Sequence, residues 1–249
     1  MTHRFAIIVP STNTMVETDC WTLRAERTSF HTGRMLIRNP VLDSDAAFER
    51  LLDEVDAAFE AAAESVLTAN PHHLIMGMSA PTFWGGADGA RNFRARAEGV
   101  TGLPVTLGSE AMRDALRSVN ANRIAILTPY PAIMRAQITR YFEDEGFDVR
   151  AFVDLHCESA TAIADVTDSV LREAVSELDV DEIDAIVQAG TNLPMISLLE
   201  RSDLGDRLGN RHPLLPINAV TLAQAYRAER VALPPVLQKL APFADGLSP

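Results

Sequence analysis

Short apolar runs alternate along the chain with longer amphipathic stretches. Phe5–Val9 is an apolar run closed by Pro10 and followed by polar residues, as expected of a buried strand. Between Phe48 and Val66, apolar residues recur at helical spacing opposite an acidic face, which predicts an amphipathic helix. Another apolar run, Leu74–Met78, predicts a second strand. This alternation predicts an α/β fold with mainly parallel sheets.

The second half of the chain repeats the first in outline. Three segments recur in the same order about 110 to 120 residues further on. The pairs are Ala6–Pro10 with Ala125–Pro129, Ile75–Ser79 with Ile186–Gly190, and Leu103–Thr106 with Leu215–Asn218. We therefore expect two pseudo-symmetric, Rossmann-like lobes with a cleft between them. Residues 1–115, completed by 212–249, form the first lobe in this interpretation, and residues 116–211 form the second.

Charge and composition narrow the classes of partner and compartment. The chain has 34 acidic and 22 basic residues, a formal net charge of −12. Such a charge repels a phosphate backbone, so we expect neither nucleic acid nor a membrane surface as a partner. No apolar run approaches the roughly 20 residues of a membrane span, and the first residues lack signal-peptide architecture. These features predict a cytoplasmic globular protein.

Cysteine and histidine usage gives no support for a metal site. Cys20 and Cys157 are too few for a disulfide framework or a four-ligand zinc site. His72 and His73 are adjacent and follow a proline, as in a surface turn. We therefore expect no bound metal.

The candidate chemistry lies in four loops that follow predicted strands. Open parallel sheets bind ligands at the carboxyl ends of their strands, where helix N-termini present unpaired N–H groups. Residues 10–13, 79–82, 128–130 and 190–192 occupy such positions and are rich in hydroxyls and small residues. They predict a site for a small anion, with two acidic groups if both lobes contribute. The alternative is that Ser11, Asn13, Ser79 and Thr191 only cap helices.

The residues after the first strand resemble a known family. Ile8–Thr18 resembles the opening signature of maleate cis-trans isomerases, and Phe30–Met35 resembles the second-strand signature of the same group. Met76–Ser79, followed by Phe83–Gly85, is similar to arylmalonate decarboxylases. Both groups belong to the aspartate/glutamate racemase superfamily. The resemblance extends from residue 5 to about residue 227.

This resemblance implies an active site in the cleft between two α/β lobes. The chemistry it implies is cofactor-free carbanion or addition chemistry on small carboxylates, so we expect no cofactor. Asn13 matches the asparagine that contacts the substrate carboxylate, and Ser79 matches a hydroxyl of the dioxyanion pocket. Tyr130 matches the tyrosine that follows the third-loop proline.

The two catalytic cysteines of the family are missing from this chain. The resemblance implies one in each lobe, at about Ala80 and at Gly190. A thiolate is the nucleophile in the isomerases, and a thiol is the proton donor in the decarboxylases. Thr191 is nearest the second lost cysteine, yet no histidine or lysine is recognisably placed to activate it. The fold and the pocket can therefore be inherited without the thiol reaction.

The two cysteines that the chain does contain have different expected roles. Cys20 lies on the first helix and is expected to be a small buried apolar group. Cys157 lies in a loop between His156 and Glu158, and the resemblance implies that this loop reaches the cleft. A thiol between a proton acceptor and a carboxylate can be tuned for reaction, unless both neighbours face solvent.

Two further side chains have a structural and a functional interpretation. Phe83 and Trp84 follow the Ser79 loop and form either core packing or an apolar wall for the substrate. Arg34 pairs either with a substrate carboxylate or with an acidic residue of the protein.

These observations lead to one hypothesis and two alternatives. We expect a cofactor-independent isomerase or decarboxylase-like lyase that acts on a small mono- or dicarboxylic acid. The alternatives are a non-catalytic carboxylate-binding or regulatory paralogue, and a lyase or hydratase that never needed a thiol. The expected partner is the small carboxylate, and a homo-oligomer is compatible with the sequence. The candidate catalytic residues are Tyr130, Ser79, Thr191 and Cys157, and the candidate substrate-binding residues are Ser11, Thr12, Asn13, Thr82, Gly190, Asn192 and Trp84.

Overall fold

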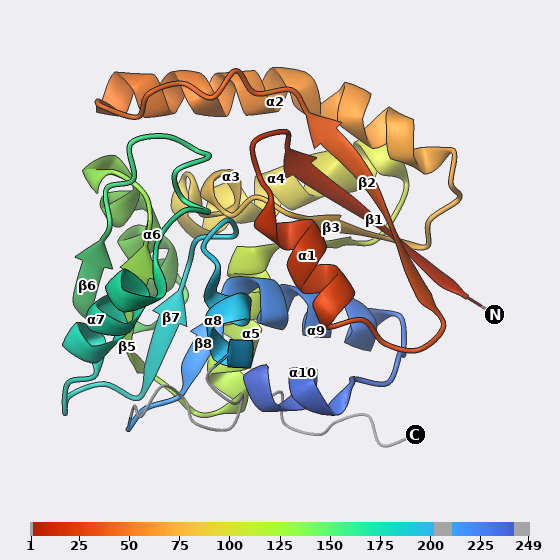
Figure 1. Ribbon diagram of the computed structural model, residues 1–249. Helices are drawn as coiled ribbons and strands as arrows, with labels where there is room; N and C mark the ends of the chain where they lie inside the picture. Colours follow the sequence, from red (N-terminus) through yellow and green to blue (C-terminus); the bar gives the residue numbers. More distant parts are fainter. Residues whose placement is uncertain (1, 202–210, 242–249) are drawn as a thin grey trace.

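The protein contains two four-stranded parallel sheets in a computed structural model that describes residues 2–201 and 211–241 (Figure 1). The strands are β1 His3–Pro10, β2 Thr28–Met35, β3 His73–Met76, β4 Val105–Thr106, β5 Arg123–Thr128, β6 Asp148–Asp154, β7 Ala185–Gln188 and β8 Leu214–Pro216. The first sheet has the order β2-β1-β3-β4, and the second has the equivalent order β6-β5-β7-β8. All paired strands run parallel, which confirms the predicted α/β fold with two similar sheets.

Ten helices connect and cover these strands in the described part of the chain. They are α1 Met15–Thr22, α2 Asp45–Leu67, α3 Ala80–Phe83, α4 Gly86–Thr101, α5 Gly108–Ser118, α6 Ala132–Asp144, α7 Asp168–Leu178, α8 Met195–Arg201, α9 Ile217–Ala228 and α10 Pro235–Leu240. Figure 1 shows α5 and α9 between the two sheets, with α2 above them. None of the described helices is long and apolar enough to cross a membrane.

The buried strands and the longest helix follow from the sequence pattern. Ala6–Val9 of β1 is fully buried, because helices cover both faces of a parallel sheet. The amphipathic stretch predicted over 48–66 is α2, and Ser44 caps it by accepting a hydrogen bond from the Ala47 N–H. Gly33 on β2 lets α2 lie close to the sheet, since a Cβ there would overlap the Ala62 carbonyl oxygen. In this lobe the elements predicted from the apolar pattern are therefore also the ones that pack against each other.

The two halves of the chain exchange elements. We expected residues 212–249 to complete the first lobe, but β8 pairs with β7 in the second sheet. The helix that follows it, α9, does pack against β3 and β4 of the first sheet. The chain therefore returns to the first lobe only after Pro216, because β8 still belongs to the second sheet and α9 is the element that crosses.

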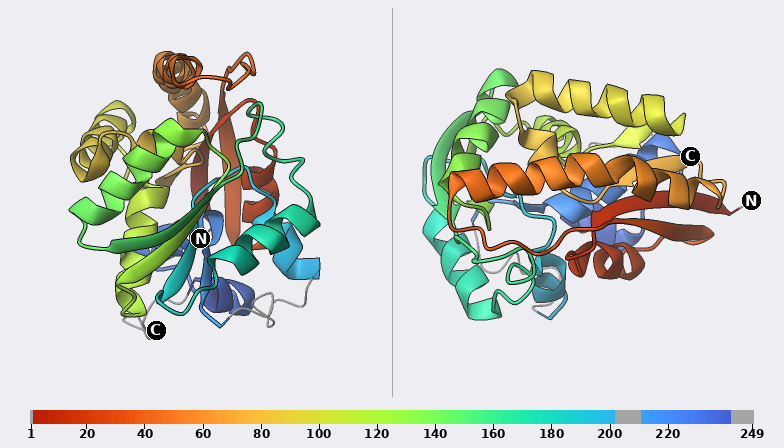
Figure 2. Two further views of the ribbon diagram at one scale, coloured as in Figure 1. Left: turned by 90° about the vertical axis from the view of Figure 1, so that its left-hand side faces the viewer. Right: turned by 90° about the horizontal axis from the view of Figure 1, so that it is seen from above.

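A segment of the first half crosses in the opposite direction. Residues 36–48, from the end of β2 to the first turn of α2, reach the second lobe, and the right-hand view of Figure 2 shows α2 spanning the molecule. Val41 forms an isolated antiparallel bridge with Ser159, and the Leu42 N–H donates to the Glu158 carbonyl. We call residues 36–48 the crossing segment.

Candidate active site

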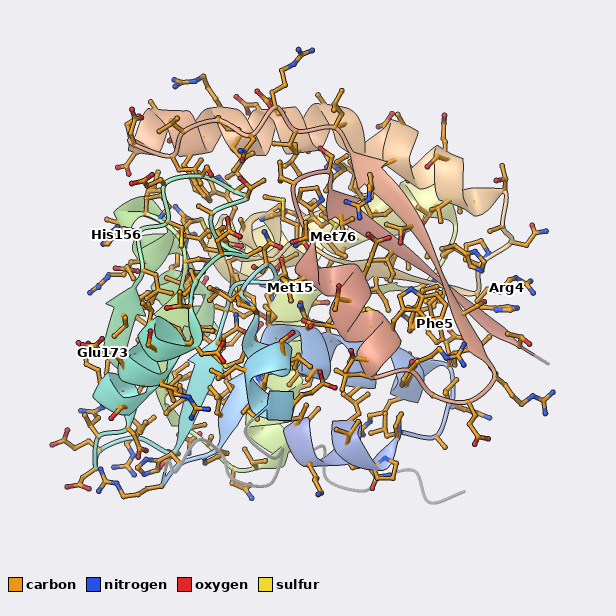
Figure 3. All side chains as sticks on the ribbon, viewed as in Figure 1. Arg4, Phe5, Met15, Met76, His156 and Glu173 are labelled. Carbon is orange, nitrogen blue, oxygen red and sulfur yellow. The ribbon has the colours of Figure 1, made fainter. Side chains whose placement is uncertain are left out.

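The four loops singled out from the sequence follow β1, β3, β5 and β7 and meet in pairs between the lobes. The loop after β1 contacts the loop after β7 through Asn13 and Thr191. The loop after β3 contacts the loop after β5 through Ser79 and Tyr130. In Figure 3, Met15, the first residue of α1, and Met76, the last residue of β3, lie near the middle of the molecule. The parallel topology therefore brings these polar residues together at the junction of the two sheets.

Ser79 and Tyr130 form a buried hydroxyl pair across this junction. Ser79 Oγ lies 2.8 Å from Tyr130 Oη and donates to the Ala189 carbonyl at 2.7 Å. Because a serine hydroxyl has a single proton, Tyr130 is the donor between the two hydroxyls. The Ala80 N–H lies close enough to the tyrosine oxygen to lower its pKa. The result is a directed chain of hydrogen bonds from Tyr130 through Ser79 to Ala189.

The Tyr130 side chain is held firmly in its neutral form. Burial raises the pKa of Tyr130 to about 12, although its hydrogen bond with Ser79 and the nearby Ala80 N–H oppose this shift. The ring of Phe48, in the crossing segment, packs edge-on against the tyrosine ring with centroids 5.6 Å apart. The Thr128 hydroxyl accepts the Tyr130 N–H at 3.4 Å and shapes the loop. At neutral pH this phenol is therefore a proton donor.

Asn13 combines a capping role with a contact across the lobes. Its Oδ1 accepts the N–H groups of Met15 and Val16, both at 3.0 Å, so it caps α1. Its Nδ2 points to Thr191 Oγ1 at 3.5 Å. The capping alternative is correct for Asn13, and the same side chain also presents an amide N–H at the junction.

Asn192 ties the second lobe to the start of α1. Its Oδ1 accepts the N–H of Thr14 at 3.0 Å and that of Met15 at 3.3 Å. Its Nδ2 donates to the Ala160 carbonyl at 2.9 Å. The N-terminus of α1, where an anion is favoured, thus carries a side chain from the other lobe.

Ser11, Thr12 and Arg34 shape the first loop. Ser11 Oγ accepts the Ile37 N–H at 3.0 Å and lies 3.3 Å from the Ile37 carbonyl, so this hydroxyl fixes the exit of β2. Thr12 is buried beside it. Arg34 donates to the carbonyls of Ser11 and Asn13 and pairs with Glu17. Arg34 therefore pairs with an acidic residue of the protein, as in the structural interpretation of this side chain.

Thr82 and Trp84 occupy the turn after β3. The Thr82 hydroxyl donates to the Ser79 carbonyl at 2.7 Å, which fixes the turn of α3. Trp84 follows α3 and is partly buried against the core. Both residues support the loop that carries Ser79.

Gly190 lies where the second family cysteine is implied. A Cβ on this residue would lie 2.6 Å from Pro129 Cγ and closer still to Pro129 Cδ, so the proline ring occupies that space. Gln188 Nε2 donates to the Gly190 carbonyl at 2.6 Å and holds it in place. Ala80, at the other implied position, is fully buried. This backbone therefore has no room for a side chain at residue 190.

Cys157 lies beside Tyr130 but lacks the expected activation. It is close enough to influence the pKa of Tyr130, and its own N–H donates to the Pro129 carbonyl at 3.0 Å. Burial raises the pKa of the Cys157 thiol to about 11. His156 and Glu158 are exposed, and Figure 3 shows His156 toward the edge of the molecule. At neutral pH the thiol is therefore protonated.

Two residues at the junction were not singled out from the sequence. Asp19 on α1 is buried, and Asn218 at the start of α9 donates to it and to the Thr191 carbonyl. Asn218 follows a predicted strand, which is the signal that marked the other loops. Asp19 follows Thr18 in a polar helix and has no such signal.

The arrangement supplies neutral donors instead of fixed cations. Hydroxyl, amide and backbone N–H groups from both lobes can bind a carboxylate and stabilise negative charge that develops next to it. Among residues 2–201 and 211–241, no three His, Cys, Asp or Glu side chains are placed together to hold a metal ion.

Comparisons with known proteins identify the family of the chain. A family model described as arylmalonate decarboxylase matches residues 5–209. The sequence is 26% identical over 240 residues to maleate isomerase from Nocardia farcinica, covering 90% of this chain and 88% of that protein.

Two solved structures share the fold. Maleate isomerase from Pseudomonas putida with maleate matches with a TM-score of 0.85 at 21% identity, covering 98% of this chain and all of that one. A mutant of Nocardia farcinica maleate cis-trans isomerase with a covalently bound succinylcysteine intermediate matches with a TM-score of 0.84 at 22% identity, over the whole of both chains.

Proposed function

The chain belongs to the arylmalonate decarboxylase family, and we propose that it is a cofactor-independent enzyme of isomerase or decarboxylase type whose substrate is a small mono- or dicarboxylic acid. The substrate would lie at the junction where the loops of the two lobes meet. The observation that carries this proposal is the Ser79–Tyr130 pair, which joins a hydroxyl from each lobe at one buried point.

The proposed mechanism is electrostatic. In the decarboxylase route, a carboxyl group leaves as CO2, and negative charge develops on the two oxygens of the remaining carboxylate. Ser79 would turn its proton from the Ala189 carbonyl, and Tyr130 its proton from Ser79 Oγ, toward those oxygens. Tyr130, neutral at assay pH, is the proposed proton donor to the α-carbon and would regain a proton from solvent. Asn13 and Thr191 would bind a further oxygen of the same substrate.

The missing family cysteines favour a second candidate function. The succinylcysteine intermediate of the Nocardia relative shows that a cysteine carries the reaction there. Here the two implied positions hold Ala80 and Gly190, and Pro129 fills the space beside the latter. A protein that only binds small carboxylates would have the same fold and donors without the reaction.

The deciding experiment follows maleate, a methyl-substituted maleate and phenylmalonate by proton NMR in deuterated buffer. Isomerisation appears as the trans acid, and decarboxylation appears as loss of the malonate with deuterium at the α-carbon. Either product supports the enzyme. A saturable rise in melting temperature without product supports the binding protein, since a ligand at 100 times its Kd adds about 2.7 kcal/mol.

Cys157→Ser is expected to retain most of the rate of any turnover found. With a pKa of about 11, roughly one thiol in a thousand is ionised at pH 8, which leaves little nucleophile. Iodoacetamide should likewise leave activity intact, and buried Cys20 is shielded from it. The measurement is kcat/KM before and after alkylation. Complete inactivation of a folded Cys157→Ser variant would instead place the nucleophile there.

A further inference from the structure

A buried carboxyl group lies behind the candidate site. Asp19 on α1 is 2% exposed, and its Oδ2 accepts a hydrogen bond from Asn218 Nδ2 at 2.6 Å. Its Oδ1 is buried without a hydrogen-bond partner among the described residues. An unpaired buried carboxyl oxygen is costly, so a protein that keeps one usually uses it.

Asn218 connects this carboxyl group to the site. The same Nδ2 donates its second proton to the Thr191 carbonyl at 2.8 Å. Both protons of the amide are therefore committed, one to α1 and one to the loop after β7. Without the acceptor on Asp19, the amide is free to rotate away from Thr191.

The Thr191 main chain in turn carries the groups that meet the first lobe. Thr191 presents its hydroxyl to Asn13, and the next residue, Asn192, accepts the N–H groups of Thr14 and Met15. A displacement of this loop therefore moves donors from both lobes.

Given the proposed function, we propose that Asp19 is a positioning residue for this site. Through Asn218 it fixes the main chain of Thr191, and thereby the placement of Asn13 and Asn192 at the junction.

Titration of Asp19 provides a signature of this role. Burial raises its pKa to about 7, and the charge of Glu200 on α8 adds to this while the bond from Asn218 opposes it. From α9 the contact is the uncharged Asn218, and on its own helix the neighbour is the buried thiol of Cys20. A carboxylate accepts a stronger hydrogen bond than a carboxylic acid does. Asn218 should therefore be held most firmly above pH 7.

The test compares wild type, Asp19→Asn, Asp19→Leu and the control Thr18→Ala, an exposed neighbour on the same helix. For wild type and the control, we expect kcat to rise through pH 7. Asp19→Asn, which is neutral at every pH, should match wild type at pH 6, show no rise, and be about tenfold slower at pH 8.5. Asp19→Leu should be slow throughout.

A second readout does not depend on catalysis. Amide exchange by NMR reports the Thr14 N–H, which Asn192 accepts. Its protection should be low in Asp19→Leu, and in wild type it should rise through pH 7. If no acid is turned over or bound but protection follows Asp19, the proposed function fails and the positioning role stands. If Asp19→Asn keeps the wild-type pH profile and protection, the positioning role is wrong.

Discussion

Tyr130→Phe is expected to lower kcat/KM by about 10² to 10³, the cost of removing a pre-organised donor to a developing negative charge. The hydroxyl lies 2.8 Å from Ser79 Oγ, and its raised pKa keeps it protonated from pH 6 to pH 9. The loss should therefore be the same across this pH range. The aromatic ring keeps its contact with Phe48, so unfolding free energy should fall by only about 1 kcal/mol.

Tyr141→Phe is the matched control for this variant. Tyr141 is also a buried tyrosine of the second half, and its ring packs on Phe83 and Phe142 instead of on the junction. Steady-state kinetics with whichever acid is turned over should show near-normal activity for Tyr141→Phe. Combining Tyr130→Phe with Ser79→Ala should cost little more than either change alone, because the two hydroxyls act as a unit. Full activity in Tyr130→Phe would remove the pair from the mechanism.

Gly190→Ala is expected to lower both stability and activity. The new Cβ would overlap the Pro129 ring, and a closed ring fixed in the chain cannot rotate away. Overpacking of this kind typically costs about 1–3 kcal/mol, and at roughly 2–4 °C per kcal/mol for a chain of this size the melting temperature should fall by several degrees. Since Tyr130 follows Pro129, the displaced loop should also lower kcat.

Gly99→Ala serves as the control for the glycine effect. Gly99 lies within α4, where an added Cβ meets nothing within 4 Å, so this change should stabilise by about 0.5–1 kcal/mol. Thermal unfolding of the two variants separates crowding from chain entropy. Gly190→Cys should resemble Gly190→Ala and should not create an efficient thiol enzyme. An unchanged melting temperature in Gly190→Ala would show that the loop tolerates the family's cysteine position.

Sequence reasoning worked best where a signal is local. The apolar runs that predict strands lie close to the observed ones, since burial on both faces of a parallel sheet requires continuous apolar residues. Parallel topology alone then places the four loops at one edge of each sheet. The contact between Ser79 and Tyr130 also depends on the second lobe. The repeat in the sequence predicted that lobe.

The parts that were missed depend on contacts between distant residues. The three-residue strand β8 carries little local signal, and our lobe boundaries overlooked the repeat, which pairs Leu215–Asn218 with Leu103–Thr106 and so gives β8 the place of β4. Asp19 lies in a short polar helix and resembles a solvent-exposed residue, but α1 packs against α9, where Asn218 donates to Asp19 from 199 positions away. Ser11 resembles a helix cap in sequence, but its hydroxyl accepts the N–H of Ile37, which follows the end of β2.

The crossing segment and α9 also bear on whether either half of the chain can stand alone. Each half gives an element to the other: the first contributes Phe48 beside Tyr130, and the second contributes a helix on β3 and β4. A half cut from this chain would expose the surface that the other half now covers. We therefore expect the two lobes to unfold in one cooperative transition, although each contains its own four-stranded sheet.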